Sequence, residues 1–236
     1  MALAGLILSL VAGLMVIVGV VAANLGLVAP LTGFYLFLAG ALLGGLLSVV
    51  VCLIGVFLSR GGRDPEGRTR SLTGLAIGLA LLIVVLGAGA TGGGDAPPIN
   101  DITTDLENPP SFASELAVPD YRGRDMSYPA DFVPIVAAEY GDIQPLRLDV
   151  PPERAFERAI AAAESLGWEI VARSDAEGVF DAQDESALFR FVDDVTVRVV
   201  AENGGSRIDV RSKSRDGRSD LGVNAERIRS FFDEMR

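Results

Sequence analysis

The chain has 236 residues, 50% of them hydrophobic, with a net charge of −11 and no histidine. The lack of histidine excludes Ser-His-Asp and Cys-His catalysis, HExxH zinc sites and imidazole acid–base chemistry. Charge is unevenly distributed: residues 1–90 carry six charged side chains, all between residues 60 and 70, whereas residues 91–236 carry 16 basic and 29 acidic ones. The sequence therefore predicts one part built for lipid and another built for water.

Three apolar runs in the first part are long enough to cross a bilayer. They are Ala2–Val21, Leu31–Leu58 and Leu72–Ala90, and about 20 apolar residues span a hydrocarbon core of ~30 Å. A cleaved signal peptide is the alternative for the first run, but such peptides begin with basic residues and have a shorter apolar core. We expect residues 1–90 to form a three-span transmembrane anchor in contact with the lipid bilayer.

The connections between these runs predict the orientation of the anchor. Arg60, Arg63, Arg68 and Arg70 lie between the second and third runs, whereas residues 22–30 carry no charge. Basic connections are retained on the cytoplasmic side of a membrane. Three spans then place everything after Ala90 outside the cytoplasm, and two spans would reverse this orientation.

The apolar runs have the composition of a passive anchor. They contain no Asp, Glu, Lys or Arg, which transporters and proton relays normally place within their spans. Gly40–Gly44 and Gly74–Gly78 match the GxxxG pattern, for which packing among the chain's own helices is favoured over dimerisation. Cys52 is the single cysteine, so an intrachain disulfide is excluded.

Residues 91–144 are predicted to form a linker that continues into an irregular strap. Residues 91–152 contain ten of the twelve prolines, which interrupt regular elements, and the glycines and prolines of residues 91–98 are typical of a flexible tether. The later part also contains aromatic and aliphatic side chains, which disordered linkers usually lack. These are Phe112, Leu116, Tyr121, Tyr128, Phe132 and Ile135. We expect the strap to pack against the domain that follows.

The hydrophobic pattern of residues 145–236 predicts a strand, a helix, four strands and a last helix. The strands are Leu146–Val150, Trp168–Arg173, Gly178–Ala182, Phe189–Val199 and Arg207–Arg215. The first helix opens at Pro151–Glu153 and ends at Gly167, and Asn224 is expected to cap the second. This order is typical of a soluble two-layer α+β domain with a mainly antiparallel sheet.

The last two strands are expected to form a hairpin with Asn203–Gly204 at the centre of its turn. This register pairs opposite charges on one face and apolar side chains on the other, whereas a turn centred on Gly204–Gly205 would oppose Arg198 to Arg211. The predicted pairs are Arg198–Asp209, Asp194–Lys213, Val199–Ile208 and Val197–Val210.

Two stretches of the chain resemble a known family. The first comprises residues 101–105, with the sequence DITTD, and 108–112, with the sequence NPPSF; the second comprises residues 191–198 and 211–228. Together they resemble the "domain of unknown function 1499" family over roughly residues 99–232. Some members of that family carry the domain behind membrane-spanning segments, and the resemblance implies no particular activity.

The second stretch concentrates charged and polar residues that form the candidate site: Asp193, Asp194, Arg211, Arg215, Arg218, Asp220, Asn224 and Arg227. Two interpretations stay open. One is a structural ion-pair network that ties the last helix to the sheet. The other is a pocket in which arginines bind an anionic small molecule or a lipid headgroup.

Other ligands are not predicted for this domain. A net charge of −13 on residues 91–236 repels the phosphate backbone of nucleic acids. Asp181, Asp184 and Glu185 match no EF-hand spacing, so we predict neither a metal site nor a cofactor. A Ser-Lys hydrolase at Lys213 is disfavoured because Ser212 and Ser214 lie on the other face of the strand.

These features predict a membrane-tethered, non-enzymatic accessory or binding domain exposed outside the cytoplasm. The chain is expected to be a multi-pass protein of the plasma or inner membrane with its C-terminal domain on the extracytoplasmic, periplasmic side. The alternative is an envelope hydrolase or lyase with a carboxylate–arginine site at Asp193, Asp194, Arg211 and Asp220. That alternative requires these groups to converge on an open cleft.

Asp193 occupies an inward position in a strand whose neighbours Val195 and Val197 are expected to face the core. A buried carboxylate needs a partner, and we expect that partner to be an arginine between residues 211 and 227. Asp193→Ala is then predicted to cost on the order of 3 kcal/mol. Asp194→Ala, on a face expected to be solvated, is predicted to cost less than about 1 kcal/mol.

Overall fold

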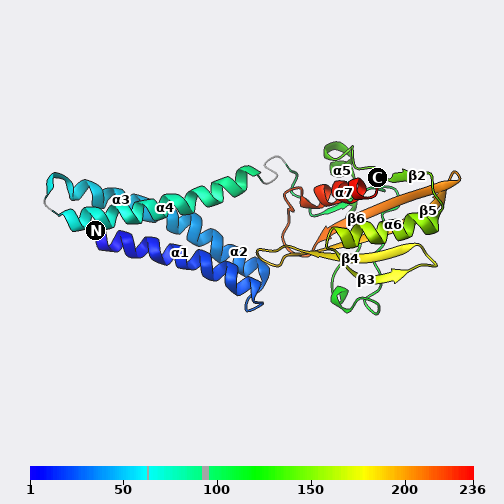
Figure 1. Cartoon of the computed structure of the whole chain (residues 1–236), viewed down its shortest axis with the longest axis horizontal. Coiled ribbons are helices and arrows are strands. Elements are labelled where there is room, and N and C mark those ends of the chain that lie inside the picture. Colours follow the sequence, from blue (N-terminus) through cyan, green and yellow to red (C-terminus); the bar gives the residue numbers. More distant parts are fainter. Residues whose placement is uncertain (63, 92–95) are drawn as a thin grey trace. The chain divides into compact units, whose positions relative to one another are not determined.

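A computed structural model of the chain describes residues 1–62, 64–91 and 96–236. Arg63 and residues 92–95 of the predicted tether lie outside the described residues. The chain forms two compact units, which we describe separately. One comprises the N-terminal helices with residues 187–190, and the other comprises residues 96–186 and 191–236; their elements are labelled in Figure 1.

The first unit contains three helices that are long and apolar enough to cross a membrane, as the sequence predicts: Ala2–Asn24, Pro30–Leu58 and Pro65–Gly87. The first is α1 (Ala2–Asn24). The second consists of α2 (Pro30–Leu38), a π-helical segment η1 (Ala39–Gly44) and α3 (Gly45–Leu58). A short 3-10 turn, η2 (Arg60–Gly62), precedes α4 (Pro65–Thr91), which contains the third.

Small residues let these helices approach one another closely. A Cβ atom added at Gly44 would lie 2.6 Å from the Cβ of Ala12, and one at Gly74 would lie 2.6 Å from the Sγ of Cys52. Ser9 is fully buried, and its hydroxyl lies 2.9 Å from the carbonyl oxygen of Gly74. Glycines of both GxxxG matches therefore pack against helices of the same chain, where a larger side chain would collide with a neighbour.

The second unit is built on an open antiparallel sheet, so the predicted α+β class is confirmed. Its strands are β1 (Asp101–Thr103), β2 (Leu146–Leu148), β3 (Glu169–Ser174), β4 (Val179–Glu185), β5 (Val192–Glu202) and β6 (Gly205–Ser214). They are arranged in the order β1-β6-β5-β4-β3, and β2 also pairs with β6. The predicted hairpin register is confirmed, because Arg198 is opposite Asp209 and Asp194 is opposite Lys213.

Strand ends differ from the prediction by a few residues, and two of the differences have a local cause. β5 begins at Val192 rather than at Phe189, because Ser186 closes a loop by donating its backbone N–H to the Phe191 carbonyl oxygen and Arg190 has a φ of +59°. A positive φ at a non-glycine residue does not continue a strand. β1 was not predicted, because three residues are too short to show a period of two.

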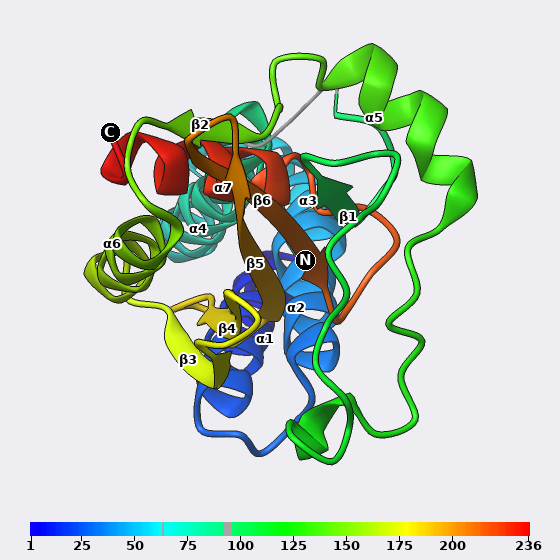
Figure 2. The same cartoon turned by 90° about the vertical axis from the view of Figure 1, so that its right-hand side faces the viewer.

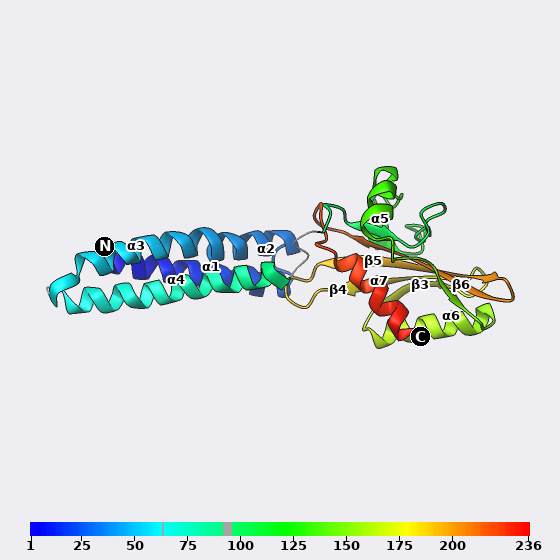
Figure 3. The same cartoon turned by 90° about the horizontal axis from the view of Figure 1, so that it is seen from above.

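Helices α6 (Pro152–Ser165) and α7 (Val223–Glu234) cover one face of the sheet. In Figure 3 both helices lie below the strands, and the green chain that follows β1 lies above the strands. The core between these helices and the sheet is apolar and includes Phe156, Phe180, Val195, Val197, Ile228 and Phe231. Trp168, the single tryptophan, is 5% exposed and stacks on Phe231 with ring centroids 5.0 Å apart.

The other face of the sheet is covered by residues 104–132, which we call the strap. It contains two short 3-10 turns, η3 (Pro119–Tyr121) and η4 (Ala130–Phe132), and leads into α5 (Val133–Glu139). In Figure 2 this green segment runs along the side of the strands away from α6. The side chains beneath it are largely charged, so strap and sheet are joined mainly by polar contacts rather than by an apolar core.

Candidate functional site

Arg211 is a buried arginine at the centre of the strap face. Its Nε and Nη2 atoms donate to the two carboxylate oxygens of Asp101 at 2.9 and 2.8 Å. The rings of Phe112 and Tyr128 lie 4.9 and 5.2 Å from its guanidinium carbon, within the range of a cation–π contact. The residue is 2% exposed. Arg211 therefore fastens the strap to the sheet and offers no surface to a ligand.

Asp194 and Arg215 form a second ion pair on the same face. Two nitrogens of Arg215 donate to the two oxygens of Asp194 at 2.9 and 2.6 Å, and Asp120 of the strap also contacts Arg215. Asp194 is 1% exposed, so the expectation that it lies on a solvated face is wrong. Strand alternation identifies the face correctly, but it does not reveal that a distant segment covers that face.

Asp193 lies on the opposite, helix-covered face, as predicted. Its Oδ2 atom accepts a hydrogen bond of 2.6 Å from Arg227 of α7, which also donates to Asp184 at 2.9 Å. The expected pairing of Asp193 with an arginine of residues 211–227 is thus confirmed. These contacts tie α7 to the end of β4 and the beginning of β5.

The start of α7 differs from the prediction. The helix begins at Val223, and Asn224 lies inside its first turn rather than at the cap. Asp220 occupies the capping role instead, because its carboxylate accepts the backbone N–H groups of Gly222 and Asn224 at 2.8 and 3.2 Å. The Asn224 side chain points to the sheet, where its oxygen accepts the Ser212 hydroxyl at 2.6 Å. Arg218 is exposed in the preceding loop.

The eight predicted site residues therefore do not form one constellation. Arg211, Asp194 and Arg215 lie under the strap, whereas Asp193, Asn224 and Arg227 lie at the junction of α7 and the sheet. Asp193 and Arg211 project from opposite faces of the sheet. The geometry matches a pair of structural networks rather than one cleft with converging carboxylates and arginines.

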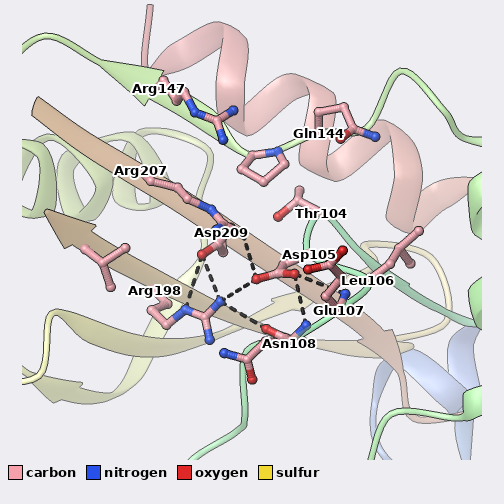
Figure 4. A pocket seen from close by; sticks show the side chains of 12 residues that line it. Thr104, Asp105, Leu106, Glu107, Asn108, Gln144, Arg147, Arg198, Arg207 and Asp209 are labelled. Atoms are coloured by element: carbon pink, nitrogen blue, oxygen red, sulfur yellow. Dashed lines mark hydrogen bonds and ion pairs between the residues drawn. The ribbon is translucent and has the colours of Figure 1, made fainter. Parts of the chain in front are cut away.

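A cavity of about 710 Å³ lies elsewhere, near the turn that joins β5 to β6 and beside the start of the strap. We call it the arginine pocket, and Figure 4 shows the side chains that line it. The charged residues among them are Asp105, Glu107, Arg147, Arg198, Arg207 and Asp209.

The centre of this pocket is a group of two arginines and two aspartates. Arg198 and Arg207 both donate to Oδ2 of Asp105, at 3.0 and 2.6 Å. Asp209, whose side chain is fully buried, accepts from Arg207 with one oxygen and from Arg198 with the other, both at 2.9 Å. Both guanidinium groups are thus held side by side in fixed orientations.

Local sequence explains how Asp105 reaches this position. The backbone N–H of Thr104 donates to the carbonyl oxygen of Val210, and the Thr104 hydroxyl accepts the N–H of Val210, each at 3.0 Å. These bonds anchor the DITTD segment on β6. The Oδ1 atom of Asp105 then accepts the backbone N–H groups of Glu107 and Asn108, in a local turn that aspartate favours.

The charge state of the pocket follows from the same contacts. Burial raises the pKa of Asp105, but the backbone N–H of Asn108 and the nearby Arg207 outweigh it, so the pKa lies below its usual value. Burial lowers the pKa of Arg207, but Asp209 and Asp105 more than compensate and raise it. Asp105 and Arg207 are therefore both charged at neutral pH.

Sequence reasoning found only part of this pocket. The hairpin register predicts that Arg198 and Asp209 face each other, but Asp105, Arg147 and Arg207 were not assigned to any site. Asp105 comes from a segment 93 residues before Arg198, and a single sequence contains no periodic signal that links the two.

The chain forms an α+β domain that follows three apolar helices in sequence. A comparison with known protein families identifies the family of this domain. Residues 101–235 match the family described as "Protein of unknown function (DUF1499)". The match covers more than half of the chain, so the chain belongs to this family, and the resemblance stated from the sequence is confirmed. None of the curated proteins matches the chain.

Proposed function

We propose that this protein is a membrane-anchored, non-enzymatic accessory or binding protein whose C-terminal domain lies outside the cytoplasm. The observation that carries the proposal is the pairing of three charge-free apolar runs with a basic segment between the second and third runs. Arg60 and Arg63 come between the second and third helices, Arg68 and Arg70 lie in the first two turns of α4 ahead of its apolar run, and residues 22–30 carry no charge. Cytoplasmic connections are enriched in arginine and lysine, and a third span then leads to the opposite side.

Binding is favoured over catalysis by the way the domain uses its charged groups. The alternative, an envelope hydrolase or lyase, requires Asp193, Asp194, Arg211 and Asp220 to meet at an open cleft. Asp193 and Arg211 project from opposite faces, Arg211 and Asp194 are covered, and Asp220 is engaged with backbone N–H groups of α7.

A pair of reporter fusions in a bacterial host tests the orientation. A reporter active only in the periplasm is fused after Arg236, and the same reporter is fused in the basic connection after Gly61. We expect activity from the first fusion and none from the second. A second reporter, active only in the cytoplasm, is fused at the same position after Arg236. Activity of this reporter and none of the periplasmic one would overturn the proposed orientation.

A further inference from the structure

We propose that the arginine pocket binds a phosphate group, held by the guanidinium groups of Arg198 and Arg207 with the help of Arg147. This inference deepens the proposed binding function by naming the chemistry of the ligand. It is independent of the side of the membrane on which the domain lies.

The first argument is the donors that the protein itself leaves unused. Arg198 donates from Nε and Nη2, to Asp209, Asp105 and the Asn108 carbonyl oxygen, and Arg207 donates from Nε and Nη2 to Asp209 and Asp105. Within the described part of the chain, no group accepts a hydrogen bond from Nη1 of either arginine. Their side chains are 19% and 25% exposed, so a ligand in the pocket that they line has access to them.

The second argument is an unfavourable arrangement of like charges around the pocket. Arg147 of β2 is directly opposite Arg207 of β6 in the strand ladder, and like charges in such cross-strand positions are destabilising. Arg147 pairs with Glu202 and its side chain is 60% exposed. A third guanidinium beside two others favours an anion that brings several acceptor oxygens to one place.

The third argument concerns the class of anion. A carboxylate is satisfied by one guanidinium fork, whereas a phosphate has enough oxygens to accept from several. The cavity is far larger than one phosphate, and Leu106, Pro145 and Val200 supply an apolar part of its lining. The ligand is therefore a phosphate ester with a compact organic part. Such a group occurs in soluble organic phosphates and in phospholipid headgroups.

The domain's acidic character does not oppose this assignment. The net charge of −13 on residues 91–236 acts against a polyanion, whose many charges extend over the whole surface. A single phosphate meets mainly the groups within a Debye length of about 8 Å. Of the three carboxylates that line the pocket, Asp105 and Asp209 are already paired with the arginines, and Glu107 is exposed to solvent.

The test uses the full-length protein in an uncharged detergent, with glycerol 3-phosphate as the soluble probe in isothermal titration. Substitution of Arg198 or Arg207 would leave the buried Asp209 short of a partner, so two other variants are chosen. Arg147→Gln removes an exposed guanidinium. Val200→Glu places a carboxylate in the pocket, opposite Arg207 in the ladder. Arg229→Gln is the control, because it removes another partly exposed arginine, which lies in α7 and pairs with Asp142.

A second arm distinguishes the source of the phosphate. The same proteins are reconstituted in nanodiscs of phosphatidylcholine with and without phosphatidylglycerol, and the retained lipid is measured by native mass spectrometry. Urea midpoints from Trp168 fluorescence verify that each variant is folded.

We expect the wild type to bind one of the two probes and both pocket variants to weaken that binding by about tenfold or more, with Arg229→Gln unchanged. Binding of glycerol 3-phosphate identifies a soluble ester, and selective retention of phosphatidylglycerol alone identifies a headgroup. Binding of neither probe, or equal weakening by Arg229→Gln, would overturn the phosphate site. Neither result bears on the reporter fusions, so the two proposals fail separately.

Discussion

Asp193 and Asp194 are neighbours in sequence, yet they belong to different networks. Asp193 shares Arg227 with Asp184, and the same guanidinium also donates to the oxygens of Asn224 and Ser212. Asp194 is the main partner of Arg215, whose other contact, Asp120, has a side chain that is 61% exposed. The loss of Asp193 therefore leaves Arg227 partly neutralised, whereas the loss of Asp194 leaves Arg215 nearly alone under the strap.

We expect Asp194→Ala to destabilise the domain by about 3 kcal/mol, because it breaks a buried pair and leaves one charge uncompensated. Asp193→Ala is expected to cost less, about 1–2 kcal/mol, because Asp184 remains next to Arg227. Urea unfolding of the full-length protein, followed by the fluorescence of Trp168, compares the two. A larger loss for Asp193→Ala would contradict this order, which reverses the one predicted from the sequence.

Asp181 is a buried carboxylate with only part of its hydrogen-bonding capacity used. Its Oδ2 atom accepts the N–H of Ala113 in the strap at 2.7 Å, and its Oδ1 atom is buried without a partner among the described residues. Burial raises its pKa, against the effect of the Ala113 N–H. The folded protein thus holds this proton more tightly than the unfolded chain does. Asp181 favours folding at low pH, and this contribution is lost as the pH rises through the raised pKa.

We expect Asp181→Asn, which keeps an acceptor for Ala113 but carries no charge, to gain stability relative to the wild type as the pH rises from about 4 to 8. Unfolding midpoints at several pH values, measured by Trp168 fluorescence, provide the comparison. Asp131→Asn, which changes an exposed aspartate of the strap, is the matched control. A constant difference between Asp181→Asn and the wild type across this range would refute the raised pKa.

Among the elements, the helix that combines α2, η1 and α3 depends on glycine for its packing against α1. Gly40 and Gly44 face Ala12, where an added Cβ would lie 2.7 Å from the Ala12 carbonyl oxygen and 2.6 Å from its Cβ, respectively. Two helix backbones come this close only where the side chains are small.

We expect Gly44→Leu to separate these helices and to speed the alkylation of Cys52, which is fully buried in the same unit. The rate of reaction with a maleimide in detergent measures this opening. Gly13→Leu is the matched control, because an added Cβ there meets no atom within 4 Å. Equal rates for Gly44→Leu and the wild type would show that this contact does not hold the helices together.

At the scale of the whole molecule, the two units bury their polar groups in different ways. The helical unit consists of helices, in which backbone groups bond to one another, and it places small side chains between these helices, as lipid requires. The sheet domain has one apolar face beneath α6 and α7 and one charged face beneath the strap, where buried arginines are matched by aspartates.

The sequence by itself determined the three apolar helices and most of the secondary structure of the domain. Apolar length identifies a spanning helix without reference to any other segment. Alternation identifies which side chains share a face, and charge pairing selects the register of the β5–β6 hairpin, because its strands are joined by a tight turn. The inward position of Asp193 and its pairing with an arginine followed from the same local rules.

Only the tertiary structure decided what covers the sheet and where the arginines gather. The strap crosses β4, β5 and β6, and its residues lie 68 to 106 positions away in the chain from the groups that they contact. In the structure Asp194 is buried, Asp220 rather than Asn224 caps α7, and Asp105 binds Arg198 and Arg207. Such contacts depend on the path of an irregular segment, which has no periodicity of its own. A single sequence therefore predicts the faces of this sheet, and only the fold shows which charged groups meet on them.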